Sequence, residues 1–194
     1  MKKLFYKYKA RRLVIDGNGA GIGLIDYMVK SQIDENGDVY PDFGVENDLD
    51  GTYKKYRTNN TEYDAMYIMK ANAPINTECH STVQTQLASG KIRFLIHEKI
   101  AKDKLLATQR GAKMTPEERA EYLKPFTLTS ILKEEMLNLR EENEGLNIIL
   151  KRANRSIKKD KFSALEYGLY YIKQEEDKKK KKKRFNAKDW AFYN

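Results

Sequence analysis

The chain has 194 residues, of which 40% are apolar and 34% charged, which is enough for one domain with a real core and a heavily charged surface. The formal net charge of +9 favours a polyanionic partner such as nucleic acid, although a basic surface that only aids solubility explains the charge equally well. No run approaches the roughly 20 apolar residues that a membrane span needs, and the single cysteine, Cys79, excludes an internal disulfide.

The first part of the chain predicts a strand, a glycine turn and a helix, in that order. Residues 2–10 are typical of the end of a helix. Residues 12–17 are typical of a short buried strand, because apolar and β-branched residues run directly into glycine. Residues 22–32 have apolar residues near helical spacing and predict a helix. Together these elements form one half of an α/β unit.

Residues 33–63 are rich in Asp, Gly, Asn and Tyr and predict an acidic surface insertion. Asp34, Asn36 and Asp38 have the spacing of the first three ligands of a calcium-binding EF-hand loop. Val39, however, stands where that loop requires glycine, so we do not expect an EF-hand here.

The rest of the chain predicts mainly helices. Thr115, Pro116 and Glu118 form a strong helix start, in which Thr115 caps the helix and Glu118 completes a capping box. In chain order we expect a strand or the first turns of a helix at 64–71, a helix at 76–88, a strand at 91–96 and a helix at 98–109. A long helix follows at 126–143 and ends at Gly145, and a buried strand follows at 146–151. The last helix is expected at 161–183, with a core stripe of Phe162, Leu165, Leu169 and Ile172. The predicted fold class is α/β, with one domain over 1–177 and a basic, aromatic tail over 178–194.

The stretch RLVIDGNGAGIG (12–23) has the composition of a phosphate-binding loop but not its spacing. In either register of a dinucleotide fingerprint the third glycine is replaced, by Ile22 or by Leu24, and a P-loop lysine is absent. Asp16 instead stands at the carboxyl end of a buried strand, where α/β sheets place ligand-binding residues. Glycines after it leave room for a DNA backbone to approach the carboxylate. In the alternative interpretation, Asp16 only caps the turn by accepting a bond from a following backbone amide.

A second aspartate, Asp160, opens the last predicted helix and follows a basic segment. A lone carboxylate among phosphate-binding cations suits a metal site that acts on a polyanion, because two-metal nucleases need several hard oxygen ligands. As an ordinary helix N-cap, Asp160 would instead bond the amide of Phe162 or Ser163. The cations that we expect to contact DNA are Lys151, Arg152, Arg155, Lys158, Lys159 and Lys161.

These two aspartate segments together resemble a known family. VIDGNGAGIGLIDYMV (14–29) and KDKFSALEYGLYYIK (159–173), with LREENEGLNIILKRANRSI between them, resemble the C-terminal nuclease domain of the large terminase subunit of tailed bacteriophages. The resemblance covers most of the chain and is weakest in the acidic insertion and the lysine tail. It implies an RNase H-like fold, a mixed sheet flanked by helices. It also implies an endonuclease that cuts concatemeric viral DNA during genome packaging, with acidic residues that bind two Mg²⁺ or Mn²⁺ ions.

By motif, the resemblance makes Asp16 and Asp160 catalytic metal ligands and puts Gly17, Gly19 and Gly21 in the turn beside the DNA. The family's first catalytic aspartate and its packaging ATPase precede the element around Asp16. We therefore expect a nuclease domain that lacks its first strands and exposes a sheet edge. Whether such a chain cuts DNA by itself is left open.

The partners implied by the resemblance are double-stranded DNA, the phage portal, the small terminase subunit and the missing N-terminal part of the large subunit. The implied location is the cytoplasm of the infected bacterium, and no membrane partner is expected. Two alternatives stay open. One is another RNase H-like nuclease, such as a junction resolvase, which would prefer branched DNA. The other is a non-catalytic module that docks on DNA or on a portal-like ring.

Overall fold

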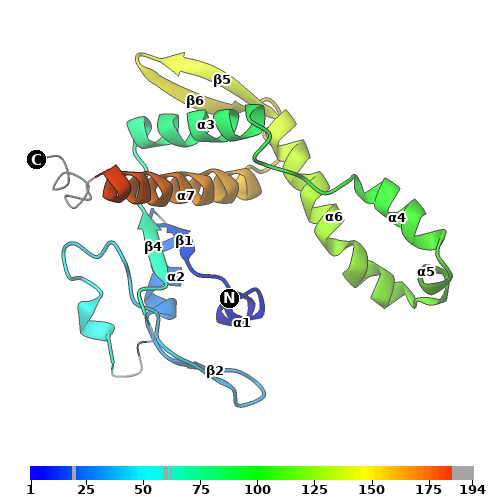
Figure 1. The fold of residues 1–194 in the computed structure, drawn as a ribbon, viewed down its shortest axis with the longest axis horizontal. Coiled ribbons are helices and arrows are strands. Elements are labelled where there is room, and N and C mark those ends of the chain that lie inside the picture. Colours follow the sequence, from blue (N-terminus) through cyan, green and yellow to red (C-terminus); the bar gives the residue numbers. More distant parts are fainter. Residues whose placement is uncertain (19–20, 59–60, 62, 185–194) are drawn as a thin grey trace, which may run out of the picture. The chain divides into compact units, whose positions relative to one another are not determined.

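The computed structural model describes residues 1–184, apart from 19, 20, 59, 60 and 62 (Figure 1). The chain forms two compact units. The first comprises Met1–Asn76 and Tyr167–Asn194, and the second comprises Thr77–Glu166. Two helices, α3 (Ala73–Ala88) and α7 (Asp160–Arg184), contribute residues to both units. The described chain contains both helices and small β-sheets, so the α/β class predicted from the sequence is confirmed.

The first unit is built around two short parallel strands. Its elements are α1 (Lys2–Lys7), β1 (Leu13–Asp16), α2 (Gly21–Met28), β2 (Gln32–Ile33), β3 (Val39–Tyr40), the 3₁₀ helix η1 (Lys54–Tyr56) and β4 (Met66–Met69). β1 pairs with β4 in parallel, with Leu13 opposite Met66 and Asp16 opposite Met69. β2 and β3 form a separate antiparallel hairpin. The predicted order of strand, turn and helix is therefore present as β1 and α2, but the helix ends at Met28 rather than at residue 32, because Gln32 pairs in the β2–β3 hairpin.

The two outer edges of the β1–β4 pair differ. Beside β4, Val45 forms a parallel bridge to Met66. The Asn47 side chain donates to the Ile68 carbonyl oxygen at 2.7 Å and accepts from the Ile68 N–H at 2.9 Å, as the backbone of a neighbouring strand would. β1 pairs with no strand other than β4 among the described residues. Within that part of the chain, β1 is thus the open edge.

Apolar side chains from α1, α2 and both strands form the core of the first unit. The segment 33–63, expected to be a surface insertion, also contributes, because Phe43 and Val45 are each at most 4% exposed. Phe43 packs against the ring of Phe5, with centroids 4.8 Å apart. The buried residues of this core are Phe5, Ile15, Ile25, Met28, Val29, Phe43, Val45, Ala65, Met66 and Ile68.

The second unit contains helices and one antiparallel hairpin. After the main part of α3 come α4 (Glu98–Leu106), α5 (Gln109–Lys113), α6 (Pro116–Leu137), β5 (Leu139–Glu144), β6 (Asn147–Arg152) and the first residues of α7. The predicted capping box of α6 is confirmed. The Glu118 N–H donates to Thr115 Oγ1 at 3.2 Å, and the Thr115 N–H donates to Glu118 Oε2 at 2.8 Å.

Three predictions for the second unit are wrong. The strand expected at 146–151 is present as β6, but it is not buried, because its residues are half-buried or exposed and Leu146 is 99% exposed. Residues 91–96 form no strand, because no neighbouring strand pairs with them in the described chain. The Leu95 carbonyl oxygen instead accepts a bond from Lys133 Nζ at 2.9 Å. The long helix ends at Leu137 rather than near 143, because residues 139–144 pair with β6. Gly145, with φ of 61°, lies in the hairpin turn and does not end a helix.

α7 is confirmed as a helix, but its buried face differs from the predicted stripe. Ile172, which we expected in the core, is 52% exposed. The side chains of α7 that are buried are Phe162, Glu166, Tyr170 and Tyr171. A carboxylate can occupy such a position only with a partner, and Glu166 has one, because its Oε2 lies 2.6 Å from His80 Nδ1.

Candidate metal and nucleic-acid site

Asp16 is the last residue of β1 and is exposed to solvent. The N–H of Asn18 donates to Asp16 Oδ1 at 2.9 Å, which is the geometry of an Asx turn. The turn-capping bond that the alternative interpretation of Asp16 predicts is therefore present. It does not exclude a metal-binding role, because a carboxylate offers about four lone-pair sites on its two oxygens. The hydrogen bond holds the carboxylate in place at the carboxyl end of the strand.

The glycines after Asp16 have a packing role in the first unit. A Cβ on Gly17 would lie 2.5 Å from Ile68 Cγ2 and 3.3 Å from the Met69 carbonyl oxygen, and the Gly17 N–H donates to that oxygen at 2.8 Å. A Cβ on Gly21 would overlap the carbonyl oxygen of Asp16. Gly19 lies outside the described residues. Close contact between β1, β4 and the start of α2 thus accounts for two of the glycines.

Asp160 is the exposed first residue of α7 and belongs to the second unit. It does not make the N-cap bonds of the alternative interpretation. Glu135, a residue of α6 that is 2% exposed, accepts the N–H of Lys161 at 2.8 Å and the N–H of Phe162 at 3.0 Å through Oε2. A carboxylate from another helix therefore caps α7. The Asp160 carboxylate is therefore exposed to solvent at the N-terminus of α7, and the backbone N–H groups of the next two residues bond to Glu135.

Three of the six predicted DNA-binding cations form contacts within the protein. Lys151 Nζ lies 2.5 Å from Glu142 Oε2, and Lys161 Nζ lies 3.3 Å from Glu135 Oε1. Arg152 donates to two backbone carbonyl groups of the loop that follows β6. The other three, Arg155, Lys158 and Lys159, are exposed and form no ion pair with any described residue.

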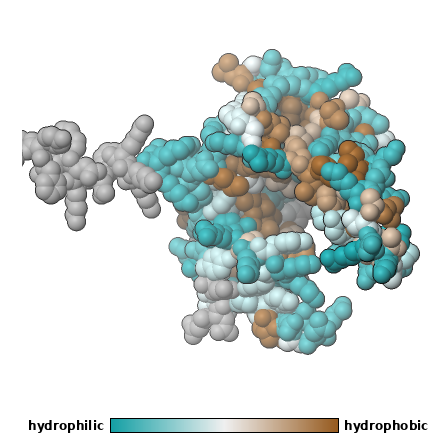
Figure 2. Space-filling view, turned by 45° about the vertical axis from the view of Figure 1, so that its right-hand side comes forward, coloured by the Kyte–Doolittle hydropathy of each residue, from teal (hydrophilic) through white to brown (hydrophobic). Residues whose placement is uncertain are grey.

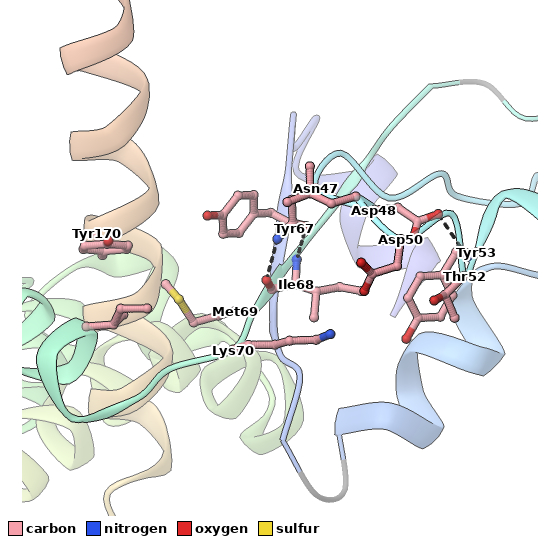
Figure 3. Close-up of a pocket in the computed structure, with 12 residues that line it drawn as sticks. Asn47, Asp48, Asp50, Thr52, Tyr53, Tyr67, Ile68, Met69, Lys70 and Tyr170 are labelled. Carbon is pink, nitrogen blue, oxygen red and sulfur yellow. Dashed lines mark hydrogen bonds between the residues drawn. The ribbon is translucent and has the colours of Figure 1, made fainter.

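A cavity of about 310 Å³ lies beside the end of β4 (Figure 3). Its polar lining includes Asp48, Asp50, Tyr53 and Lys70. Asp48 Oδ2 accepts the N–H of Tyr53 at 3.0 Å. Burial and the nearby charges of Asp26 and Asp48 raise the pKa of Tyr53. We did not predict this cavity from the sequence. The sequence feature that could have indicated it is Lys70, a cation near the end of the strand considered at 64–71.

An ionic network joins the start of β1 to the later part of α7 within the first unit. Glu46 Oε2 accepts bonds from Arg12 Nε at 2.7 Å and from the Tyr171 hydroxyl at 2.8 Å. Burial alone would raise the pKa of Glu46, but the bonds from Arg12 and Tyr171 lower it below its ordinary value. Burial and the bond to Glu46 raise the pKa of Tyr171 to about 12. The network fixes the strand that ends at Asp16 against α7.

The two aspartates offer hard oxygen donors of the kind that Mg²⁺ and Mn²⁺ prefer. Asp16 belongs to the first unit and Asp160 to the second. Among the residues that the structure describes, no three or more His, Cys, Asp or Glu side chains are grouped to hold a metal ion. Each aspartate by itself thus has the donor chemistry that suits these metals.

Comparisons of the chain with protein-family models, with curated proteins and with solved structures found no match. No helix in the described ranges is both long and apolar enough to cross a membrane.

Proposed function

We propose that this chain is the nuclease part of a metal-dependent DNA endonuclease of the phage terminase large-subunit type, with an RNase H-like fold. The observation that carries the proposal is the position of Asp16. Its exposed carboxylate stands at the carboxyl end of β1, in a parallel strand pair and directly before the glycine turn into α2. Ligand-binding residues of α/β sheets occupy this position. The pair of aspartate motifs and the net charge of +9 agree with the proposal.

In this proposal Asp16 and Asp160 are ligands of two Mg²⁺ or Mn²⁺ ions, which when bound supply an activated water and stabilise the leaving oxygen of the DNA. The chain's own residues do the rest. Asn18 holds the Asp16 carboxylate in place, and Glu135 fixes the helix turn that carries Asp160. The exposed cations of residues 155–159 contact the phosphate backbone, which positions the duplex without reading its bases.

The proposed substrate is concatemeric double-stranded DNA in the cytoplasm of an infected bacterium. The proposed protein partners are the phage portal, the small terminase subunit and an N-terminal part of the large subunit. They rest on the resemblance of the aspartate motifs alone.

The test is Mn²⁺-dependent cleavage of supercoiled plasmid by the full-length natural polypeptide. We expect Asp16→Asn and Asp160→Asn each to abolish cleavage while plasmid binding in a gel-shift assay stays within about twofold of the wild type. Asp26→Asn in α2 and Asp103→Asn in α4 are matched controls, because each removes an exposed carboxylate from the same unit. We expect both controls to cleave normally.

Undiminished cleavage by either test variant would contradict the metal-binding role of that aspartate. Strong preference for a four-way junction over linear duplex would favour the resolvase alternative. Plasmid binding without any Mn²⁺-dependent cleavage by the wild type would contradict the nuclease and support the docking module.

A further inference from the structure

A groove of about 430 Å³ lies between α4, α5 and α6, entirely within the second unit. Most of its lining is apolar and includes Leu105 of α4 and Met114, which precedes α6. Tyr122 and Phe126 of α6 also line it, and their rings stack with centroids 5.9 Å apart. Tyr122 is 48% exposed, and Ile96, which lies shortly before α4 and also lines the groove, is 41% exposed. Large apolar side chains are therefore open to solvent along this groove.

Cations surround the apolar lining. Lys104 and Arg110 line the groove themselves. Over residues 98–113 there are five Lys or Arg residues against two acids. All five are exposed, and none forms an ion pair with another described residue: Lys99, Lys102, Lys104, Arg110 and Lys113. At the groove itself, the charges of Lys104 and Arg110 are therefore available to a partner.

The combination of an apolar groove and flanking cations decides between two kinds of partner. A phosphate backbone would gain from the cations, but it carries nothing that removes the apolar lining from water. An amphipathic helix with acidic residues beside its apolar face would gain from both features. Exposed apolar patches bordered by polar residues commonly mark protein-binding sites. Figure 2 shows such brown apolar residues at the surface among teal hydrophilic ones.

We propose that this groove binds an acidic amphipathic helix of a partner protein. Apolar side chains spaced one helical turn apart on the partner pack against Leu105, Met114 and Phe126. Acidic side chains beside them pair with Lys104 and Arg110. Tyr122 is the anchor, since aromatic residues dominate the binding energy of protein interfaces, and Met114 adapts to the shape of the ligand. The inference does not depend on the proposed nuclease function.

The test begins with a display library of random peptides of about 16 residues, selected against the purified chain. We expect the enriched peptides to be net negative and to carry apolar residues at helical spacing. One enriched peptide is then synthesised, and its dissociation constant is measured by fluorescence anisotropy. Lys104→Glu with Arg110→Glu should weaken binding at least about tenfold, and Tyr122→Ala should have a similar effect.

The matched control is Lys99→Glu with Lys102→Glu, which makes the same charge change on α4 at residues that do not line the groove. We expect it to weaken binding by no more than about threefold. None of these substitutions removes a buried side chain, and far-UV circular dichroism verifies that each variant folds.

Three results would overturn the proposal. The first is enrichment of peptides with no acidic bias, or no enrichment beyond that obtained with the Tyr122→Ala variant. The second is equal weakening by the control pair and the groove pair. The third is a loss of affinity for short duplex DNA in the groove variants with peptide binding unchanged, which would show that the cations serve nucleic acid instead.

Discussion

Replacing Glu135 tests how the start of α7 is held. This carboxylate is 2% exposed, and one of its oxygens accepts the N–H groups of Lys161 and Phe162, the second and third residues of α7. Its other oxygen lies 3.3 Å from Lys161 Nζ. Glu135→Ala leaves two backbone donors without an acceptor. Loss of a helix cap costs about 1 kcal/mol, and a buried donor left unpaired costs about 1–3 kcal/mol. Because these two costs overlap, we expect a loss of about 1–3 kcal/mol in the free energy of unfolding.

Glu135→Gln keeps an acceptor oxygen but loses the negative charge at the helix N-terminus, which is worth about 0.3–1 kcal/mol. We therefore expect it to cost about 1 kcal/mol. Lys161→Met removes only the ion pair. Since the Lys161 side chain is 40% exposed, that pair contributes about 1 kcal/mol at most. We therefore expect Glu135→Ala to lower the free energy of unfolding most and Glu135→Gln to lower it less. Lys161→Met should lower it by the same amount as Glu135→Gln or by less.

Two measurements verify this order. Urea unfolding followed by far-UV circular dichroism gives the loss of stability, and amide hydrogen exchange gives the local effect. Exchange at Lys161 and Phe162 should accelerate most in Glu135→Ala, because these are the amides that it bonds. The reasoning is refuted if Glu135→Ala stays within about 0.5 kcal/mol of the wild type or if Gln at this position is as harmful as Ala.

Two further predictions concern the first unit. Gly21→Ala should lower the free energy of unfolding by about 1–3 kcal/mol, because its Cβ would overlap the backbone at the end of β1. Gly23→Ala is the control, since Gly23 lies in the same helix with open space around it, and it should be neutral or stabilising by up to about 1 kcal/mol. Equal urea midpoints for the two variants would contradict the packing explanation. Tyr171 has a pKa of about 12 in the folded protein against an ordinary value of 10.0, so the native state binds more protons above pH 10 and loses stability as the pH rises toward 12. Tyr171→Phe should remove this part of the alkaline loss, as measured by urea midpoints below and above pH 10, and identical pH profiles for both proteins would show that the bond to Glu46 does not hold the proton.

Local patterns in the sequence predicted the elements whose causes are local. The strand–glycine–helix order of residues 12–32 and the capping box at Thr115 need only neighbouring residues. The strand predicted at 91–96 failed because a strand also needs a neighbour to pair with, which alternation cannot provide. The prediction that residues 139–143 continue the helix failed because these residues do have a strand to pair with. Their pairing with β6 across Gly145 outweighs the helical spacing that runs on from α6.

The candidate site shows the same division. The place of Asp16 at the end of a strand was readable from the residues next to it. The role of Glu135 was not, because it caps a helix that begins 25 positions later in the chain. Its only signal in the sequence is an acid between Leu132 and Met136 on the predicted apolar face of α6. A carboxylate in such a position requires a buried donor, but the sequence does not say which one.

The turn that begins at Asp16 brings the structural and the functional interpretation together. Close packing explains Gly17 and Gly21, and the bond from the Asn18 N–H explains an acceptor side chain at position 16. Neither observation requires a negative charge, since Asn accepts the same bond. A metal ligand does require it, because Mg²⁺ and Mn²⁺ prefer ionised oxygen donors. Asp16→Asn therefore separates the two roles: the fold should keep its stability, and only metal-dependent chemistry should disappear. A variant that loses both would mean that the charge serves the turn itself.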